Sequence, residues 1–252
     1  MRGKGGQGKV TGAIIEARSS STRLPGKILL PILGEPLLAR LIERLRRAET
    51  LDTIIIATTT NPADDRVGKF AEQAGVGCFR GSGEDVLGRV LGAAKAFSID
   101  VIVEVTGDCP LLDPAEVDKV VRAYGSGPWD YASNVLRRTY PRGLDTQVFS
   151  TELLERVAGL TRDPVDREHV SLYIYEHPGM FSLTNVESDL PEKWHDLRLT
   201  VDTREDLELV TAIYEALYPG KPDFDLGDVI GLLERRGDLL EINQHIAQKQ
   251  VR

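Results

Sequence analysis

Short apolar runs alternate along the chain with longer stretches of helical period. Residues 12–17, 54–57 and 101–105 are almost continuously apolar, which is typical of strands buried on both faces of a parallel sheet. Between them, as at residues 38–45 and 86–97, apolar side chains recur every three or four positions, so one face of a helix would be buried. Strands alternating with helices predict an α/β fold with a mostly parallel sheet and helices on both faces.

Four helix starts can be read from a capping side chain followed by an acidic first turn. Asn61, Asp113 and Asp163 each precede a proline, which suits the first position of a helix, and Thr203 begins a similar segment without proline. A further strand is predicted at residues 197–201, just before Thr203. These signals predict helices that begin near residues 62, 114, 164 and 204.

The simple alternation is interrupted between residues 130 and 190. This region contains a strand, a basic loop, a second strand, a helix and a third strand, at residues 131–134, 137–143, 145–149, 170–174 and 181–184. We expect it to form a small lobe over the edge of the sheet, where an acceptor or a second subunit would bind.

Length and composition favour one domain of the globular type. The chain has 252 residues, of which 41% are hydrophobic, and no apolar run approaches the roughly 20 residues that span a bilayer. We expect residues 11–252 to form a single domain that ends in amphipathic helices after Pro222. The glycine-rich residues 1–10 are predicted to be a disordered tail without a secretory signal, so a cytoplasmic location and no membrane partner are expected.

That tail contains partial matches to two phosphate-binding motifs. Residues 3–8 fit G-x-G-x-x-G, and Lys9 nearly completes G-x-x-x-x-G-K-[ST], but Val10 stands where a hydroxyl should be. Both motifs need a strand before the glycines and a helix after them, whereas only two residues precede Gly3 and a strand-like run follows. We interpret both matches as accidental.

Charge and the rarer residue types exclude several function classes. With a net charge of -8 the chain lacks the broad basic surface of a general nucleic-acid-binding protein. Cys78 and Cys109 form no C-x-x-C pair, the four histidines have no metal-ligand spacing, and no G-x-S-x-G occurs. A disulfide scaffold, a zinc site and an α/β-hydrolase nucleophile are therefore not expected.

One purely basic segment contrasts with this acidic background. Residues 17–27 follow the first strand and carry Arg18, Arg23 and Lys27 with no acid, together with several hydroxyls. Open α/β sheets bind ligands at the carboxyl ends of their strands, and hydroxyls, backbone N–H groups and cations suit a polyphosphate. The segment is predicted to bind a triphosphate.

Two aspartates follow other predicted strands and could complete such a site. Asp108 follows residues 101–105, and Asp202 follows residues 197–201. If those strands neighbour the first one, both carboxylates face the basic segment, as in Mg²⁺ sites built from carboxylates and phosphate oxygens. Asp202 could equally help to start the helix after Thr203, whereas Asp108 has no such capping role. Phosphoryl transfer depends on cations and a metal more than on a dedicated nucleophile, so this set suits it.

Several ordered motifs resemble the cytidylyltransferases that make CMP-activated sugars, in particular the spore-coat polysaccharide biosynthesis branch. They lie at residues 17–27, 81–89, 106–111, 142–145, 167–170 and 201–207, so the resemblance covers roughly residues 12 to 210. It implies a Rossmann-like nucleotidyltransferase fold, a three-layer sandwich, with CTP and Mg²⁺ and usually a homodimer.

The resemblance also implies roles for individual residues. The catalytic residues would be Arg18, Lys27, Asp108 and Asp202, with the two aspartates as ligands of Mg²⁺. The nucleotide would be bound by Ala17, Ser19, Arg23, Lys27, Ser82 and Asp85, with Arg89 a weaker candidate. The acceptor would be bound by Arg142, Asp145, Gln147, Arg167, Glu168 and His169. Glu104 and Gln147 stand where Arg and Glu are more usual in this branch, and these departures concern the acceptor rather than the nucleotidyl chemistry.

The expected reaction is transfer of CMP from CTP to a hydroxyl or phosphate of a sugar, with release of pyrophosphate, for the synthesis of a surface polysaccharide or glycoconjugate.

Three alternative functions stay open. A sugar-1-phosphate nucleotidyltransferase would use UTP or dTTP in the same basic loop. The second alternative is a nucleotide-sugar glycosyltransferase. Many of these enzymes need an Asp-x-Asp metal motif after a strand, and the segment that begins at Asp108 lacks the second aspartate. The third is a catalytically silent nucleotide-binding subunit. Arg142 suits a carboxylate and a phosphate equally well.

Overall fold

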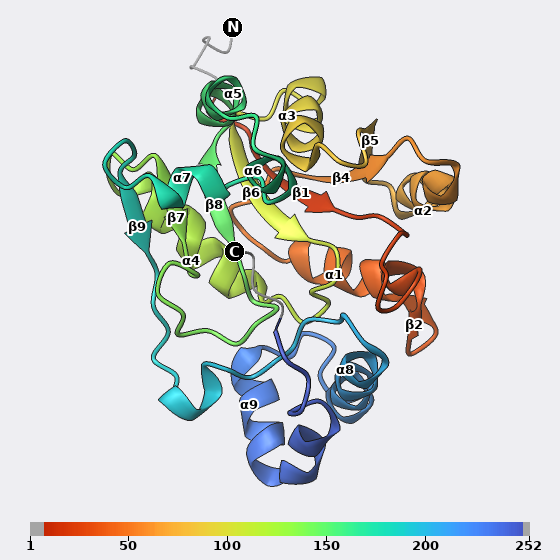
Figure 1. Cartoon of the computed structure of the whole chain (residues 1–252). Helices are drawn as coiled ribbons and strands as arrows, with labels where there is room; N and C mark the ends of the chain where they lie inside the picture. Colours follow the sequence, from red (N-terminus) through yellow and green to blue (C-terminus); the bar gives the residue numbers. More distant parts are fainter. Residues whose placement is uncertain (1–7, 249–252) are drawn as a thin grey trace, which may run out of the picture.

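Seven strands form the central sheet of residues 8–248, the part of the chain that the computed structural model describes (Figure 1). Their order across the sheet is β5-β4-β1-β6-β8-β7-β9. In that order the strands are Gly77–Gly81, Thr53–Thr59, Thr11–Glu16, Val101–Thr106, Gln147–Ser150, Tyr131–Ser133 and Leu183–Asn185. Within this sheet β8 pairs antiparallel with β6 and β7, and the other pairs are parallel, so β8 alone of these seven described strands runs against the rest. The predicted, mostly parallel sheet is confirmed.

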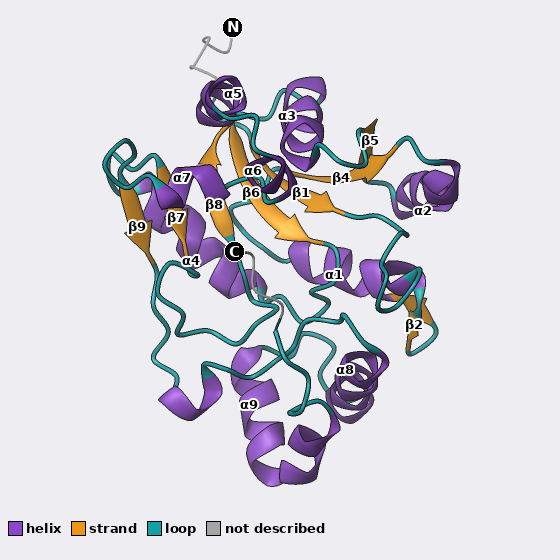
Figure 2. Cartoon of the chain, viewed as in Figure 1, coloured by secondary structure: helices purple, strands orange, loops and turns teal. Residues whose placement is uncertain are grey.

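Helices cover both faces of the sheet and give it three layers (Figure 2). The core on one side of the sheet contains side chains of α1 (Leu37–Leu45), α2 (Asp65–Ala74), α4 (Pro114–Gly125), α8 (Arg204–Leu217) and α9 (Leu226–Arg235), with α8 and α9 packed against each other. The other face packs against α3 (Val86–Ala96), α5 (Thr151–Leu160) and the short α7 (Leu172–Glu176), with α6 (Pro164–Glu168) beside α3. Because side chains alternate along a strand, β1 sends Ala13 and Ile15 into the first core and Ile14 into the second.

The predicted helix starts agree with the structure. Asp113, Asp163 and Thr203 cap α4, α6 and α8 with their side chains, and Thr203 forms a reciprocal capping box with Asp206. Asn61 caps a 3-10 turn, Pro62–Asp64, that leads into α2. The remaining short elements are β2 (Pro31–Ile32), β3 (Glu35–Pro36) and the 3-10 turns Lys27–Leu29, Glu192–Trp194 and Gly237–Ile242.

The predicted strand at residues 197–201 is wrong. This segment is not part of the sheet and makes a single isolated bridge, between Arg198 and Arg142. Leu199 and Val201 are fully buried, so the alternating apolar pattern reflects packing against the core rather than pairing with a neighbouring strand. The segment crosses the ends of the strands instead, and Val201 donates its N–H to the carbonyl of Asp108 at 2.9 Å.

Residues 130–190 extend one edge of the central sheet through β7, β8 and β9 and add α5, α6 and α7 to one face. The role of this region as a lobe for dimerisation stays a prediction. Most of the predicted disordered tail, residues 1–7, lies outside the described residues. Within residues 8–248 no helix is both long enough and apolar enough to cross a membrane.

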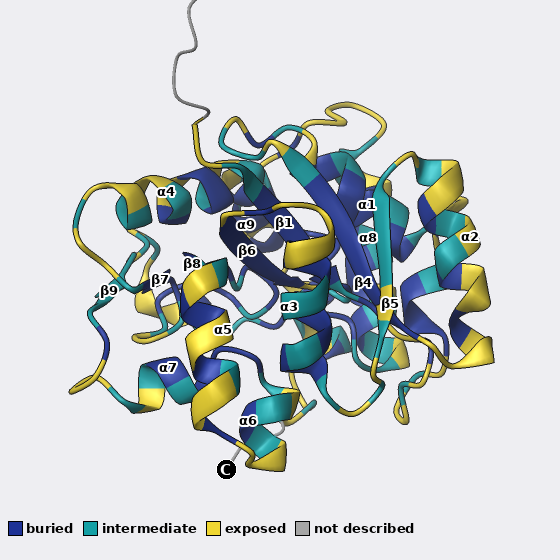
Figure 3. Cartoon of the chain, turned by 90° about the horizontal axis from the view of Figure 1, so that it is seen from above, coloured by how far each residue is buried: buried dark blue, intermediate teal, exposed yellow. Residues whose placement is uncertain are grey.

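The strand order places a crevice at the end of β1. The chain continues from β1 to β4 on one side and returns to β6 on the other, so the loops after β1 and β6 lead away from each other. Such a switch point is where open α/β sheets bind ligands. Figure 3 shows these strands buried between the two helical layers, and Thr106, at the carboxyl end of β6, is exposed.

Candidate active site

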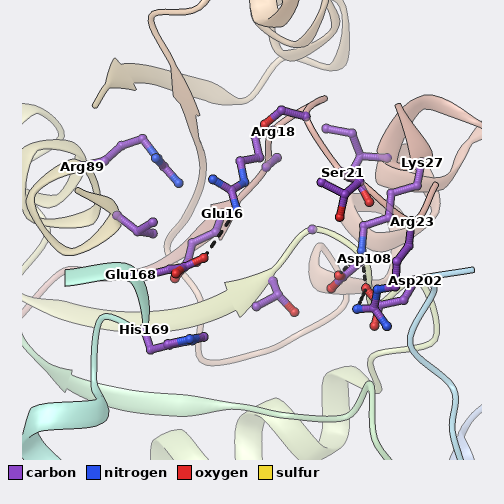
Figure 4. A pocket seen from close by; sticks show the side chains of 17 residues that line it. Glu16, Arg18, Ser21, Arg23, Lys27, Arg89, Asp108, Glu168, His169 and Asp202 are labelled. Atoms are coloured by element: carbon purple, nitrogen blue, oxygen red, sulfur yellow. Dashed lines mark hydrogen bonds and ion pairs between the residues drawn. The ribbon is translucent and has the colours of Figure 1, made fainter. Parts of the chain in front are cut away.

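A pocket of about 380 Å³ opens at the carboxyl ends of β1 and β6 (Figure 4). Its walls come from the loop after β1, the turn after β6, the start of α3 and the end of α6. Of the residues predicted from the sequence, the pocket is lined by Ala17, Arg18, Arg23, Lys27, Asp108, Glu168, His169 and Asp202. The predicted basic segment and both aspartates therefore meet in one place.

Lys27 lies at the centre of this arrangement. Its Nζ is 2.5 Å from Asp108 Oδ2 and 2.7 Å from Asp202 Oδ1. Gly26, directly before it, has a φ of 69°, a left-handed conformation that glycine adopts without strain, and donates its N–H to the carbonyl of Ser19 at 3.0 Å. The loop thus folds back on itself and directs the Lys27 side chain towards the two carboxylates.

Asp202 is surrounded by cations. Besides Lys27, its carboxylate contacts Arg23 at 2.9 Å and Arg198 at 2.6 Å. Burial raises the pKa of Asp202, but these partners, Lys27 foremost, outweigh it and hold the pKa below its ordinary value. Burial lowers the pKa of Lys27, and the carboxylates of Asp108 and Asp202 reverse this, so the pKa lies above its ordinary value. Lys27 and Asp202 are therefore charged at neutral pH.

Arg198 is a site residue that the sequence interpretation missed. Its guanidinium is buried and joins Asp202 to Asp206, with an Nε to Oδ1 distance of 2.8 Å to the latter. Asn243, after α9, donates to the Arg198 carbonyl and to Asp206 Oδ1 at 3.0 and 2.9 Å. The C-terminal segment, which carries no chemical motif, thus fixes a residue that positions Asp202.

Asp108 and Asp202 fit the divalent cation that the resemblance implies. Oxygens of both carboxylates contact the same nitrogen of Lys27, so they lie close enough to bind one small cation together. Carboxylate oxygens are the ligands that Mg²⁺ prefers, and it usually takes only one or two from the protein with phosphate and water oxygens completing the set. Within residues 8–248 no cluster of three or more acidic, His or Cys side chains suits a metal, so two carboxylates are the candidate donor set.

Three predicted nucleotide-binding residues have other roles in the structure and are not among the described residues that line the pocket. Ser19 is buried, and its N–H donates to Asp64 Oδ1 at 2.7 Å. Ser82 Oγ accepts from the N–H of Asp85 at 3.0 Å, and Asp85 caps α3 by accepting from Gly88 at 2.8 Å. These contacts shape the loops around the pocket, and direct contact with a nucleotide stays a prediction.

Two arginines face the pocket in different surroundings. Arg18 is exposed at the mouth, 3.7 Å from Glu168, and donates to the Gly83 carbonyl at 3.3 Å. Arg89, on α3, is only 2% exposed and donates to the Ser82 carbonyl, while its Nε has no partner among the described residues. A buried guanidinium with an unused donor is suited to an anionic ligand. The structure therefore favours Arg89 as a nucleotide-binding residue more strongly than the sequence did.

A second pocket, of about 690 Å³, adjoins the first. Predicted acceptor residues that line it are Arg142, Asp145, Gln147, Glu168 and His169. The last two line both pockets, so they lie where the two pockets meet. Arg167 does not line it among the described residues and instead forms an ion pair with Asp85.

The cations of the second pocket differ in their partners. Arg138 binds Asp145 through two parallel hydrogen bonds of 2.8 and 2.9 Å. The half-buried guanidinium of Arg142 makes no such bond or ion pair with the described residues, and burial, aided by the neighbouring Arg138, lowers its pKa. An unpaired guanidinium in a pocket is suited to a carboxylate or a phosphate of a ligand.

Comparison with known proteins agrees with this geometry. Residues 12–222 match the model of a family described as cytidylyltransferase. The chain is 34% identical over 232 residues to the spore coat polysaccharide biosynthesis protein SpsF of Bacillus subtilis, covering 89% of this chain and 94% of that protein. It is 35% identical to an uncharacterised protein of Methanocaldococcus jannaschii, covering 95% and 96% of the two chains.

Solved structures extend the comparison. A cytidylyltransferase from Leptospira borgpetersenii superimposes with a TM-score of 0.87 at 33% identity, covering 96% of this chain and all of that one. A CMP:2-keto-3-deoxy-manno-octonic acid synthetase complexed with CTP shares the fold, with a TM-score of 0.63 at 19% identity, covering 82% of this chain and 99% of that one. The chain therefore belongs to the cytidylyltransferase family and is a CTP-dependent nucleotidyltransferase.

Proposed function

We propose that this enzyme transfers CMP from CTP to a sugar or sugar-acid acceptor and releases pyrophosphate in a reaction that requires Mg²⁺. The observation that carries the proposal is the position of Lys27 Nζ between Asp108 and Asp202, at the edge of the sheet where the second pocket begins. Relatives support the acceptor class: SpsF is named for spore coat polysaccharide biosynthesis, and other relatives are named 3-deoxy-manno-octulosonate cytidylyltransferases.

In this proposal Arg18, Arg23 and Lys27 neutralise the triphosphate, while Asp108 and Asp202 hold the metal. When bound, Mg²⁺ would withdraw charge from phosphate oxygens. An acceptor oxygen attacks the α-phosphorus in line, a new P–O bond forms, and the bond to the β-phosphate oxygen breaks as pyrophosphate leaves. His169, which lines both pockets, is the side-chain candidate to accept the proton of a hydroxyl acceptor.

Arg142 is assigned to the acidic group of the acceptor, because its guanidinium faces the second pocket without a bonded partner among the described residues. The other proposed acceptor residues are Asp145, Gln147, Glu168 and His169, which line the same pocket, and Arg167, which would act from outside it through its ion pair with Asp85. We also propose a homodimer in the cytoplasm, with residues 130–190 at the contact. Light scattering coupled to size-exclusion chromatography tests the dimer, and a mass equal to one chain at working concentration rejects it.

The experiment for the proposed function combines nucleotides with acceptors. The full chain is incubated with each of CTP, UTP, dTTP, ATP and GTP, with Mg²⁺ and a panel of keto-acid sugars and sugar phosphates. Pyrophosphate and the nucleotidyl sugar are measured. We expect product with CTP, and loss of product when a chelator removes the metal. Product with UTP or dTTP and never with CTP would reject the proposal.

A further inference from the structure

The ammonium of Lys27 occupies the space where a cation bound by both Asp108 and Asp202 would lie, and Figure 4 shows its side chain directed at the two carboxylates. Its Nζ is 2.5 Å from Asp108 Oδ2 and 2.7 Å from Asp202 Oδ1. Mg²⁺ lies about 2.0 to 2.1 Å from its oxygen ligands, so an ion that joins these same two oxygens would have to lie between them, in the space of Nζ. Lys27 and a metal ion therefore exclude each other from this pair of oxygens.

The charges around Asp202 also oppose a metal ion while Lys27 stays in place. Besides Lys27, the Asp202 carboxylate contacts Arg23 at 2.9 Å and Arg198 at 2.6 Å, and Arg198 is shared with Asp206. The negative charge of Asp202 is thus already balanced by its neighbours. A divalent cation added to this cluster would meet like charges at short range unless one of them left.

The loop allows Lys27 to exchange its partners while its backbone stays fixed. The Lys27 N–H donates to the carbonyl of Leu24 at 3.2 Å, and the Lys27 carbonyl accepts from the N–H of Leu30 at 3.0 Å. The ammonium, in contrast, is carried on a flexible stem of four carbons. Residues 20–22, which bear three hydroxyls, line the same pocket as Lys27. A phosphate bound by these hydroxyls would share that pocket with the ammonium.

We propose that Lys27 holds Asp108 and Asp202 until a triphosphate draws its ammonium away, so that the two carboxylates bind a divalent cation together with the nucleotide and only weakly before it. Phosphate oxygens offer the ammonium new acceptors, and its departure frees both carboxylates. Nucleotide and metal then bind with positive coupling, and one side chain carries that coupling. The inference rests on the proposed function for the identity of these two ligands, and it adds the order in which they bind.

The first test measures binding of Mn²⁺ to the full chain without nucleotide, by electron paramagnetic resonance of the free ion. Lys27→Met removes the ammonium, and Lys27→Gln removes the charge but keeps a hydrogen-bond donor, so a folding defect in one variant leaves the other. Arg23→Met is the matched comparison, since Arg23 pairs with Asp202 alone among the described residues. Lys193→Met, on the surface, is the control. Circular dichroism checks that each variant is folded.

We expect both Lys27 variants to bind Mn²⁺ at least about tenfold more tightly than the wild type, because the competing cation is gone. Arg23→Met should strengthen binding by a smaller factor, and Lys193→Met should leave it unchanged. Equal affinities in the wild type and the folded Lys27 variants would overturn the proposal. An equal gain in Arg23→Met would also overturn it, because that gain would reflect the loss of one positive charge rather than the release of a shared position.

The second test measures binding of CTP by calorimetry with a chelator present. In the wild type Lys27 must leave two carboxylates to reach the phosphates, whereas in Asp108→Asn it must leave only Asp202. We expect Asp108→Asn to bind metal-free CTP about threefold or more tightly than the wild type, and this gain to vanish when the same substitution is made in Lys27→Met. A gain that persists without Lys27 would reflect repulsion between Asp108 and phosphate. That result, or no gain at all, would contradict the proposal.

Neither test depends on turnover, so the inference and the proposed function can fail separately. If CTP is turned over but the Lys27 variants bind Mn²⁺ no better than the wild type, the inference is wrong and the proposed function stands. If both binding results are as expected but no acceptor yields pyrophosphate from CTP, the inference is supported and the proposed function is not.

Discussion

Lys27 is the residue on which the nucleotide site depends most. It is nearly buried, and it contacts two carboxylates that come from distant parts of the chain. The sequence predicted its proximity to Asp108 from the carboxyl end of the strand that is β6, whereas Asp202 reaches Lys27 from a segment that is not a strand, so the reason given for Asp202 was wrong although the contact is present. It did not predict Arg198, since an arginine inside an alternating apolar segment gives no sign that it binds an aspartate four residues later.

Replacing Lys27 by Met should lower kcat/KM for CTP by about 10²- to 10³-fold, because a preorganised cation at the developing negative charge is lost. Pyrophosphate release measures this effect, with circular dichroism to confirm that the variant is folded. Lys193→Met is the control, since Lys193 is exposed and pairs with Glu234 on the surface. Activity of Lys27→Met close to that of the wild type would remove Lys27 from the catalytic set.

The buried pair of Glu16 and Glu104 should make stability depend on pH. Their pKa values are raised in the folded state, so between about 4.3, the unperturbed value for Glu, and the folded values the folded chain binds more protons than the unfolded chain. The contribution of the pair to stability is therefore complete below that range and is lost as pH rises through about 7, the pKa of Glu16. Burial is the principal cause of both shifts.

Glu104→Gln cannot ionise, so its free energy of unfolding should exceed that of the wild type by an amount that grows between pH 5 and pH 8. Urea denaturation at several pH values measures the difference. Glu155→Gln, with its exposed carboxyl, should show no such trend. A difference between Glu104→Gln and the wild type that does not change with pH would contradict the assignment of a raised pKa to this pair.

At the scale of elements, the capping residues explain why the helix starts could be predicted from the sequence. They also make one long-range contact that the sequence could not predict. The Asp-Pro pairs at Asp113 and Asp163 predicted the starts of α4 and α6 because capping is local. Asp113 has a second role, since its Oδ2 accepts from the N–H of Leu226 at 2.6 Å and fixes the start of α9 against α4. Such a contact between residues 113 positions apart leaves no local signal.

Asp113→Ala should therefore cost about 2 to 4 kcal/mol, roughly 1 for the cap and the rest for a buried N–H left without an acceptor. Asp163→Ala, which removes a cap at the start of the short α6, should cost about 1 kcal/mol. Chemical denaturation of both variants gives the comparison. Equal losses in the two variants would show that the bond to Leu226 contributes nothing.

Two elements differ from the sequence prediction for the same physical reason. Residues 197–201 alternate like a strand but lie across the ends of the sheet, and β5 forms from a segment with two glycines that carries little strand signal. In both cases packing against the rest of the fold, rather than the local sequence pattern, determines whether the segment forms a strand of the sheet. A side chain on Gly77 would come within 2.3 Å of Ile55, so the close approach of β5 to β4 depends on this glycine.

For the molecule as a whole, the topology explains why residues after β1 and after β6 could be predicted from the sequence to share one site. Parallel strands bring their carboxyl ends to one edge, and the switch in strand order at β1 opens a crevice there. The second pocket was harder to predict, because it is built at the antiparallel strand β8, where chain direction reverses. That Glu104 and Gln147 both line it follows only when the register between β6 and β8 is known.

The central claim is that Asp108 and Lys27 lie at the centre of a CTP-dependent transfer. Asp108 tests it most directly, because the sequence offers no capping role for it and its carboxylate contacts Lys27. The measurement is the rate of pyrophosphate release from CTP by Asp108→Asn and by the wild type, with Mg²⁺ and an acceptor that the wild type uses. Asp238→Asn, which alters an exposed ion pair, is the control. We predict a loss of about 100-fold or more for Asp108→Asn and none for the control. A rate near that of the wild type for Asp108→Asn would contradict the account.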